Sequence, residues 1–324
     1  MDHVLERLCR QEYVSGEELS REMGMTRAAI WKKIEALREN GWEIESCGKR
    51  GYRLNPGDRL EPVLWESRLQ TGQLGRGENR FAPVMDSTNH QVKEMAVAGA
   101  AHGSLALCEQ QTAGRGRLGR TWVSHSGVGL WHSLLLRPQM HPSQAPFVTF
   151  LCAMAMARAL ADLGFPDGKI KWPNDLVLGG RKICGILNEV SCDMDHIEYL
   201  VLGVGLNVLR GSVPPELSQT AGCLEDAGPV PYRRDILVRY LFHLEALLHV
   251  LQREGFPALT EDYRAMSCTL GRPVKVIGNG DTQSFQGVAE AMDDTGALLV
   301  RDPDGVLRRV LAGDVSVRGV MGYV

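Results

Sequence analysis

The first 55 residues show helical spacing of apolar positions followed by an alternating pattern. A first helix is predicted near the N-terminus and a second over Gly16–Met23. Thr26 can cap a third helix over Arg27–Glu39. The alternation over Trp42–Leu54 predicts a hairpin with a basic tip. Together these elements predict a winged helix-turn-helix domain over residues 1–56.

Residues 57–268 carry a longer pattern in which strands outnumber helices. The breaker cluster Asn55–Asp58 predicts a linker before it. Helices are predicted over Leu60–Gly72, Gln91–Ala98, Pro146–Leu163 and Arg233–Arg253. Strands are predicted over Phe81–Met85, Ser104–Glu109, Gly129–Leu136, Lys169–Leu178, Arg181–Val190 and Ile197–Val208. Because hairpin-length turns join several strands, a mixed sheet covered by helices fits better than a doubly wound parallel fold.

From Arg272 onward the pattern changes to short strands separated by turn residues. These strands are predicted over Pro273–Ile277, Phe285–Met292, Ala297–Arg301, Val306–Leu311 and Val315–Arg318, with turns at Asp281, Asp293–Gly296 and Asp304–Gly305. This spacing predicts a small SH3-like β-barrel over residues 269–324. The whole chain is therefore expected to be an α+β protein of three domains.

Composition narrows the class of protein. The 324 residues are 44% apolar, enough for a sizeable core, and the net charge of −3 argues against a protein that coats nucleic acid. The apolar block Phe147–Leu163 contains Arg158 and Asp162, so it is expected to be too short and too charged to span a membrane. No apolar segment follows Met1, which predicts a cytoplasmic protein without a signal peptide.

The eight cysteines are scattered along the chain. They include no CxxC pair and no histidine spacing typical of a zinc site. We therefore expect reduced thiols and no zinc.

The stretch Gln111–Trp122, QTAGRGRLGRTW, alternates three glycines with three arginines. Glycine lets the backbone approach a ligand closely, and consecutive N–H groups can then converge on an anion. Arginine adds permanently charged planar groups that match phosphate oxygens. The pattern favours a loop that closes over a phosphate or pyrophosphate. Gly/Arg repeats also occur in RNA-binding tails and in ordinary solvated loops, so the neighbouring motifs decide between these interpretations.

A polar cluster, Asp86–Asn89, follows a predicted strand and precedes a helix. Hydroxyl groups and free backbone N–H groups converge at such a helix start. A simple N-cap would explain Ser87 or Thr88, but it would not explain the whole cluster.

The segment Lys169–Leu178 contains Pro173 at its centre, where proline is out of place in a central strand. Asn174 and Asp175 would project at that break as a carboxamide and a carboxylate. Lys182 follows at the start of the next strand. A lysine in that position can equally be an edge-strand residue that discourages aggregation.

The predicted third helix would enter the major groove of DNA, while the hairpin tip touches the backbone. The candidate DNA-contacting residues are Thr26, Arg27, Trp31, Lys32, Lys49 and Arg50. Residues 1–55 contain ten basic and ten acidic side chains, so a helical protein-interaction module is the alternative. We favour DNA binding by a dimer, because one such small domain seldom holds specific DNA tightly.

Five motifs in this order resemble the family of bifunctional biotin–protein ligases and biotin operon repressors, the biotin–[acetyl-CoA-carboxylase] ligases. They are DSTN at 86–89, QTAGRGRLGRTW at 111–122, KWPND at 171–175, RKxxGIL at 181–187 and GVGLN at 203–207. The resemblance covers nearly the whole chain. It implies a winged helix-turn-helix over 1–56, a class II synthetase-like biotin ligase catalytic domain over 57–268 and an SH3-like barrel over 269–324.

The resemblance also implies a two-step reaction. Biotin and ATP, with Mg²⁺, would give biotinyl-5′-AMP and pyrophosphate. The biotinyl group would then pass to a lysine of the biotin carboxyl carrier protein of acetyl-CoA carboxylase. Biotinyl-5′-AMP would also serve as corepressor by favouring a homodimer that binds operator DNA and represses biotin synthesis genes.

The family pattern assigns site residues one by one. Catalytic roles fall to Lys182, Arg115, Arg117, Arg120 and Asp175, and Asp175 is also the candidate Mg²⁺ ligand. The biotin-binding positions are Ser87, Thr88, Asn89, Gln111, Gly114, Arg115, Gly116, Arg117, Trp122, Lys182 and Gly185. The adenylate- or ATP-binding positions are Arg117, Arg120, Trp122, Asn174, Lys182 and Asn207.

The chain departs from the family pattern in two places. The family's third helix commonly carries a polar residue where this chain has Trp31, so no operator sequence is carried over. The loop 219–228 usually brings a tryptophan over the adenine, whereas this chain has small residues there.

Two other functions compete with this interpretation. A lipoate or octanoate transferase would have a similar catalytic fold, but the complete GRGRxGR loop together with KWPND favours biotin. A ligand-sensing transcription regulator without ligase activity would need only affinity. The presence of Lys182 and of all three loop arginines favours an enzyme.

Overall fold

The computed structural model describes residues 3–278, 284–312 and 315–319. The chain divides into two compact units. The first comprises Met1–Leu69 with Tyr232–Asp235, and the second comprises Gln70–Pro231 with Ile236–Val324. The finer division into three domains, with boundaries near residues 56 and 268, stays a prediction.

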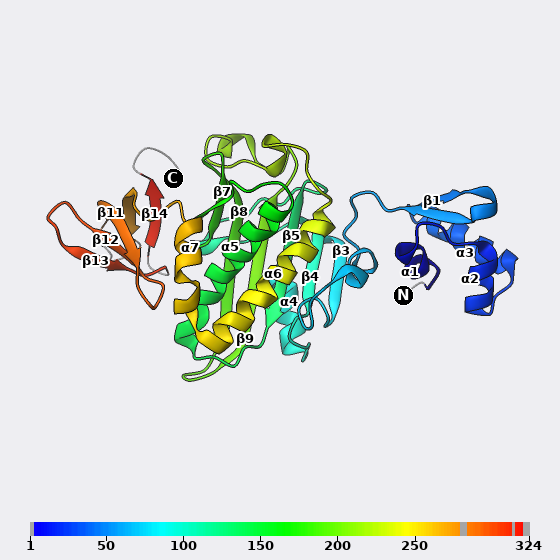
Figure 1. Ribbon diagram of the computed structural model, residues 1–324, viewed down its shortest axis with the longest axis horizontal. Helices are drawn as coiled ribbons and strands as arrows, with labels where there is room; N and C mark the ends of the chain where they lie inside the picture. Colours follow the sequence, from blue (N-terminus) through cyan, green and yellow to red (C-terminus); the bar gives the residue numbers. More distant parts are fainter. Residues whose placement is uncertain (1–2, 279–283, 313–314, 320–324) are drawn as a thin grey trace. The chain divides into compact units, whose positions relative to one another are not determined.

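The first unit contains three helices and a hairpin, which confirms the predicted winged helix-turn-helix (Figure 1). Its elements are α1 (His3–Arg10), α2 (Gly16–Met23), α3 (Arg27–Glu39), β1 (Glu43–Ser46) and β2 (Tyr52–Asn55). Gly24 turns the chain after α2 with a φ of 64°. The Thr26 hydroxyl then caps α3, accepting a hydrogen bond from the Ala29 amide at 3.2 Å. Local capping therefore fixes the position of the third helix.

The helix predicted over Leu60–Gly72 is wrong. The segment contains two separate 3₁₀ turns, Pro62–Leu64 and Glu66–Arg68. An α-helix would require the Leu60 carbonyl to accept the amide four residues on. The Trp65 indole N–H donates to that carbonyl instead, at 3.0 Å. The apolar side chains of this segment are buried as expected, but the backbone that carries them is irregular.

The core of the second unit is a seven-stranded mixed sheet (Figure 1). In order across the sheet, the strands are β3 (Asn79–Met85), β4 (Leu105–Gln111), β5 (Gly129–Leu136), β9 (Ile197–Asn207), β8 (Arg181–Cys192), β7 (Asp175–Leu178) and β6 (Lys169–Lys171). β3 and β4 run parallel, whereas the other neighbouring pairs are antiparallel. This confirms the mixed sheet expected from the turn lengths.

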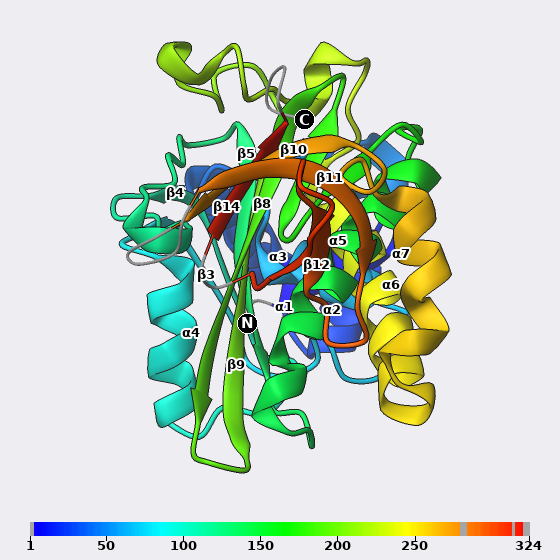
Figure 2. The same ribbon diagram turned by 90° about the vertical axis from the view of Figure 1, so that its left-hand side faces the viewer.

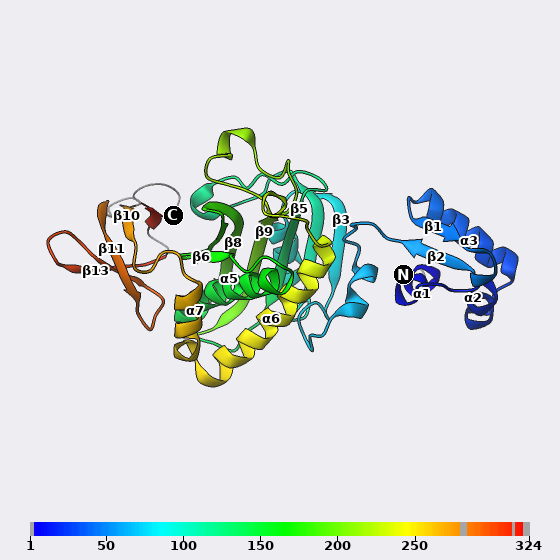
Figure 3. The same ribbon diagram turned by 45° about the horizontal axis from the view of Figure 1, so that its top comes forward.

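Helices cover both faces of the sheet (Figure 2). α4 (Thr88–Val97) lies on one face, and α5 (Ala145–Asp162), α6 (Arg233–Glu254) and α7 (Thr260–Met266) lie on the other. Figure 3 shows α5 and α6 side by side across that second face. Successive strand residues point to opposite faces. Ser133 of β5 therefore meets the start of α4, while the neighbouring His132 packs against Tyr240 of α6.

The apolar segment that contains α5 corrects one expectation. Among the described residues, Pro142–Asp162 is long and apolar enough to cross a membrane by length and composition. The structure buries 72% of its most apolar window inside the protein. Its apolarity is therefore accounted for by a core helix packed against the sheet.

The predicted strand Lys169–Leu178 is two strands, which corrects the sequence interpretation. β6 and β7 pair antiparallel and are joined by a turn with a cis Trp172–Pro173 peptide bond. The proline thus lies outside the hydrogen-bonded ladder, where its missing N–H costs nothing. β8 lies between β9 and β7, so the edge-strand explanation for Lys182 is also wrong.

The C-terminal strands form a separate antiparallel sheet of the second unit, in the order β13-β12-β11-β10-β14. Their bounds are β10 (Pro273–Gly278), β11 (Phe285–Met292), β12 (Leu298–Arg301), β13 (Leu307–Val310) and β14 (Val315–Gly319). The order agrees with the predicted small barrel. The predicted turn at Asp281 lies outside the described residues. All eight cysteines lie within the described ranges and are free thiols.

Candidate active site

A cavity of about 390 Å³ opens on the α4 side of the sheet. Its wall comes from the start of α4, the Gly/Arg loop, the turn between β6 and β7, strands β8 and β9, and the segment 212–221. The cavity brings together most of the residues that the sequence singles out: Ser87, Thr88, Asn89, Gln111, Arg115, Gly116, Arg117, Arg120, Trp122, Asn174, Asp175, Lys182, Gly185 and Asn207. Motifs spread over about a third of the chain thus meet at one place.

Glycines form part of the cavity floor. A Cβ atom at Gly205 would lie 2.5 Å from Trp122 Nε1, and one at Gly185 would lie 2.7 Å from Trp122 Cζ3. The indole of Trp122 therefore lies directly on the backbone of β8 and β9. It also meets Trp131 edge-on, with ring centroids 6.3 Å apart. Glycine is required at these two positions because any side chain would displace the indole.

The Gly/Arg loop is a folded hairpin. The amide of Gly116 donates to the Arg120 carbonyl at 2.7 Å, and the Trp122 amide donates to the Gly114 carbonyl at 2.9 Å. Gly114 itself is buried, and a Cβ there would lie 2.4 Å from the Trp122 carbonyl oxygen. Gly119 turns the tip with a φ of 72°. The loop is therefore ordered by its own backbone, unlike a solvated tail.

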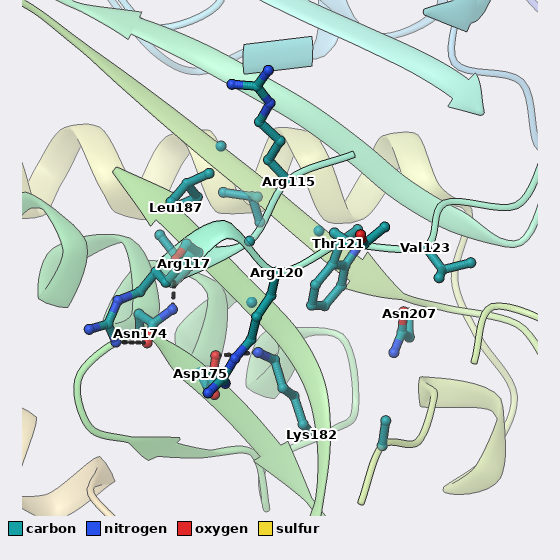
Figure 4. Close-up of a pocket in the computed structure, with 18 of the residues that line it drawn as sticks. Arg115, Arg117, Arg120, Thr121, Val123, Asn174, Asp175, Lys182, Leu187 and Asn207 are labelled. Atoms are coloured by element: carbon teal, nitrogen blue, oxygen red, sulfur yellow. Dashed lines mark hydrogen bonds and ion pairs between the residues drawn. The ribbon is translucent and has the colours of Figure 1, made fainter. Parts of the chain in front are cut away.

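Lys182 and Asp175 form the charged centre of the cavity (Figure 4). Lys182 Nζ lies 2.6 Å from Asp175 Oδ1, and both side chains are largely buried. The same ammonium lies 5.1 Å from the centre of the Trp122 ring, within range of a cation–π contact. The carboxylate pairs with the ammonium group, which lies over the face of the Trp122 ring.

The three loop arginines point in different directions (Figure 4). Arg117 donates to Asn174 Oδ1 at 2.9 Å and to the carbonyl of Ala312, which follows β13. Burial lowers the pKa of Arg117, while the nearby Asp175 charge opposes that change. Arg120 extends toward Asp175, and Arg115 points away from it. Two of the three predicted arginines are therefore near the charged centre.

The opposite end of the cavity is polar and closely hydrogen-bonded. The Thr88 amide donates to Gln111 Oε1 at 2.9 Å, and Gln111 Nε2 donates to Ser124 Oγ at 2.8 Å. Ser87 is the N-cap residue of α4, yet its side chain makes no capping hydrogen bond within the described residues. The cluster at the start of α4 is therefore more than a helix cap.

A third wall comes from the segment that follows β9. Residues 220–222 run beside Lys182: its amide donates to the Thr220 carbonyl, and the Gly222 amide donates to the Lys182 carbonyl, each at 2.9 Å. Asn207 Nδ2 donates to the Gly222 carbonyl at 3.0 Å. Ala221 lines the cavity here. Asn207 thus positions this wall through its amide.

The predicted DNA-contacting residues lie in the first unit. Trp31 is 54% exposed on α3, and Arg27, Lys32, Lys49 and Arg50 are exposed as well. Arg27 forms an exposed ion pair with Glu17 at 2.7 Å, and the Arg50 guanidinium lies 4.3 Å from the centre of the Tyr13 ring. Thr26 is occupied as the cap of α3. The remaining residues form an exposed, mainly basic surface on α3 and on the hairpin tip.

Sequence reasoning missed several residues around the cavity. Ser124, Ser133 and Glu189 bond directly to predicted site residues. A Cβ atom at Gly203 would lie 2.0 Å from Asn89 Oδ1, so this glycine makes room for Asn89. The alternation of Gly203 and Gly205 within a strand was the available signal, because glycine in a strand often marks close approach of another group.

Comparisons with known proteins find similar sequences for each part of the chain. A model of the biotin/lipoate A/B protein ligase family matches residues 81–207, an HTH domain model matches residues 1–53, and a biotin protein ligase C-terminal domain model matches residues 269–318. The chain is 33% identical to the bifunctional ligase/repressor BirA of Escherichia coli over 96% of this chain and 95% of that protein.

Two further relatives extend the comparison. The bifunctional ligase/repressor BirA of Bacillus subtilis is 32% identical over 94% of each chain. The structure of a biotin protein ligase from Aquifex aeolicus in complex with biotin and ATP superposes with a TM-score of 0.65 at 26% identity, covering 75% of this chain and 99% of that one. The chain therefore belongs to the biotin protein ligase family and combines its catalytic and C-terminal domains with an N-terminal helix-turn-helix.

Proposed function

We propose that this protein is an ATP-dependent biotin–protein ligase and also a DNA-binding repressor of biotin synthesis genes. The ligase would form biotinyl-5′-AMP and pass the biotinyl group to a lysine of the biotin carboxyl carrier protein of acetyl-CoA carboxylase. Biotinyl-5′-AMP would remain bound as corepressor. The observation that carries the enzymatic part is the Lys182–Asp175 pair, set between a polar pocket and an arginine-bearing loop.

The first step sets a clear electrostatic requirement. A biotin carboxylate must approach an α-phosphate although both groups are negative. Lys182 would counter both charges, while Arg117 and Arg120 would hold the phosphates of the nucleotide and the departing pyrophosphate. A positioned donor of this kind contributes roughly 3–4 kcal/mol to the transition state in related chemistry.

The second step needs a base or an orienting acceptor for the incoming amine. Asp175 is the carboxylate beside the charged centre, and Asn174 lies next to it with its amide fixed by the Ile186 backbone. We assign to Asp175 the role of orienting the attacking lysine. The polar pocket lined by Ser87, Thr88 and Asn89 would hold the ring of biotin meanwhile.

Magnesium would arrive with the nucleotide. The described residues include no group of three or more histidine, cysteine, aspartate or glutamate side chains placed to hold a metal ion. Mg²⁺ typically keeps several waters and binds through one or two carboxylates plus substrate phosphates. Asp175 fits that limited role as a single carboxylate. When bound, the ion would neutralise phosphate charge.

The experiment that tests the ligase is transfer of labelled biotin to a purified carrier domain in the presence of MgATP. Wild type should label the domain, and Lys182→Ala should be slower by about 10²–10³-fold. Lys169→Ala, an exposed lysine of β6, is the matched control and should transfer at the wild-type rate. Biotin binding without any transfer by wild type would instead favour the sensor without ligase activity.

The repressor function rests on the exposed basic surface of α3 and the hairpin tip. We expect the protein to retard DNA from upstream of biotin synthesis genes more strongly when biotin and ATP are present. The double variant Lys49→Ala/Arg50→Ala should weaken this binding, whereas Arg10→Ala on α1 should leave it unchanged. Sedimentation should show a dimer only with both ligands, and an unchanged monomer would contradict the corepressor mechanism.

A further inference from the structure

Four side chains form a continuous hydrogen-bonded chain behind the polar end of the cavity. Glu189 Oε2 accepts from Asn89 Nδ2 at 2.7 Å. Asn89 Oδ1 lies 2.6 Å from Ser133 Oγ, which lies 2.7 Å from Thr88 Oγ1. Asn89, Ser133 and Thr88 are each at most 6% exposed. These bonds therefore connect β8, α4 and β5, and only Glu189, whose side chain is 27% exposed, has appreciable access to solvent.

The Glu189 carboxylate fixes one end of this chain as an acceptor. Its other oxygen accepts from Lys93 Nζ at 2.6 Å. Burial works to raise the pKa of Glu189, but the hydrogen bonds from Lys93 and Asn89 and the nearby Arg115 charge outweigh it and lower that pKa. An ionised carboxylate can only accept hydrogen bonds. Asn89 must therefore turn its NH₂ group toward Glu189 and its carbonyl oxygen toward Ser133.

The number of hydroxyl hydrogens determines the direction of the remaining hydrogen bonds among these side chains. Ser133 has one hydroxyl hydrogen, and the Asn89 carbonyl oxygen requires it. The short Ser133–Thr88 contact then needs the hydrogen of Thr88. The alternative is a bond from Thr88 to Gln111 Oε1, at the longer distance of 3.2 Å, which would leave two oxygens 2.7 Å apart with no hydrogen between them. The Thr88 hydroxyl therefore donates to Ser133 and faces the cavity as an acceptor.

We infer that Glu189, which is not itself among the cavity-lining residues, is a positioning residue. It sets the donor–acceptor direction of this series of four hydrogen-bonded side chains, the relay, and thereby makes Thr88 an acceptor for N–H groups of the ligand. The inference rests on the proposed function, because the ureido ring of biotin carries two N–H donors. A site that offers an acceptor to such a donor rejects analogues that carry an oxygen there instead. Glu189 thus contributes to ligand selection from a distance.

The variant Glu189→Gln should reverse the relay rather than simply weaken it. Lys93 can only donate, so it would hold the carbonyl oxygen of the new amide. The NH₂ group of the new amide would then face Asn89. The Asn89 carboxamide would rotate so that its carbonyl oxygen accepts from this NH₂ group. Ser133 would then accept from Asn89 and donate to Thr88. Thr88 would present its hydrogen to the cavity, where the ligand N–H already points.

Titration calorimetry of the full-length protein with biotin alone tests this reversal. Glu189→Gln should weaken biotin binding by about tenfold, the loss of one hydrogen bond plus a clash of two donors. The KM for biotin should rise similarly, while the KM for ATP and kcat stay within twofold of wild type. A carbamate analogue, with one ureido N–H replaced by oxygen, should be rejected less strongly by the variant than by wild type.

Four further variants separate the relay from a merely structural effect. Lys93→Met removes the ion pair but leaves Glu189 as the acceptor, so biotin affinity should stay within twofold of wild type. Glu198→Gln, an exposed glutamate of the neighbouring strand, should also leave it unchanged. Asn89→Asp combined with Glu189→Gln should restore affinity, because the new carboxylate accepts from both neighbours. Asn89→Asp alone should bind poorly, since two carboxylates would then face each other.

Each result decides the inference. Wild-type affinity in Glu189→Gln, a loss of affinity in Lys93→Met as large as in Glu189→Gln, or no recovery in the double variant would overturn the relay. If wild type itself fails to bind biotin, the proposed function fails instead, and the two failures are thereby distinguished.

Discussion

The two faces of the central sheet differ in chemistry although they share the same strands. Toward α4, β8 and β9 present Gly185, Gly203 and Gly205, and the space above them holds the cavity and its paired charges. Toward α5 and α6, the alternate residues of β9 are Val204 and Leu206, both buried. Because successive residues of a strand point to opposite faces, neighbouring residues of β9 line the cavity and pack in the core by turns.

The face of the sheet that packs against α5 and α6, called the core face below, also keeps the titratable groups packed against it neutral. Burial lowers the pKa of His132 to about 3 and raises that of Cys152 to about 12. It also raises the pKa of Tyr240, whose hydroxyl lies 3.2 Å from Cys152 Sγ. The opposite face, called the site face below, lines the cavity and instead carries Lys182 and Asp175, whose Nζ and Oδ1 atoms lie 2.6 Å apart. Substitutions on the two faces should consequently affect different measurements.

The largest expected effect is on the core face. Leu206→Ala removes a fully buried side chain of β9, and it should lower the free energy of unfolding by about 3 kcal/mol, within the range for buried leucines. Urea denaturation followed by circular dichroism measures this change. Biotin transfer at a temperature where the variant is folded should stay near the wild-type rate, and a large loss of transfer would break the separation of the faces.

The neighbouring residue on the other face should behave in the opposite way. Gly205→Ala places a methyl group 2.5 Å from Trp122, so the indole must shift. We expect biotin transfer to fall by about 10²-fold, the scale of a 1 Å misplacement near a reacting centre. The urea midpoint should change little by comparison. An active Gly205→Ala would show that the position of Trp122 is unimportant.

Acid should destabilise the core face through His132. Its folded pKa of about 3 lies below the unfolded value near 6.5, so the unfolded chain binds an extra proton between these values. The contribution to stability is complete above pH 6.5 and falls by about 1.4 kcal/mol per unit as pH decreases through that window.

Between pH 6.5 and 5, wild type should therefore lose about 2 kcal/mol that His132→Gln does not lose. Urea unfolding at several pH values measures the two slopes. His196→Gln, at an exposed histidine of the β8–β9 hairpin, is the control and should keep the wild-type slope. Parallel slopes for wild type and His132→Gln would show that this imidazole is not kept neutral by burial.

The smallest effect concerns thiol reactivity along β8. Cys192 is exposed at the end of the strand, whereas Cys184 is fully buried and burial raises its pKa well above the ordinary value. A thiol-specific reagent should modify Cys192 first in the native protein, and it should modify Cys184 only after denaturant is added. Mass spectrometry of the labelled peptides distinguishes the two sites. Rapid native labelling of Cys184 would indicate that the core face opens.

Local signals account for what sequence reasoning predicted well. The bounds of α2 and α3 follow from Ser15, Gly24 and Thr26, which cap or end the helices within a few residues. The same reasoning failed at Leu60–Gly72 because the Trp65 indole, rather than a backbone amide, bonds to the Leu60 carbonyl. Apolar spacing alone cannot distinguish a helix from irregular chain that buries the same residues.

The sequence by itself determined the N-terminal winged helix-turn-helix, the mixed sheet, the small C-terminal sheet and the motifs that identify the family. The tertiary structure decided which of these residues meet. Asn89 and Glu189 are 100 positions apart along the chain, and Arg117 and Asn174 are 57 apart. Such contacts depend on the order and register of β5, β9 and β8. Strand order is set by burial of the whole sheet rather than by neighbouring residues, so no local pattern reveals it.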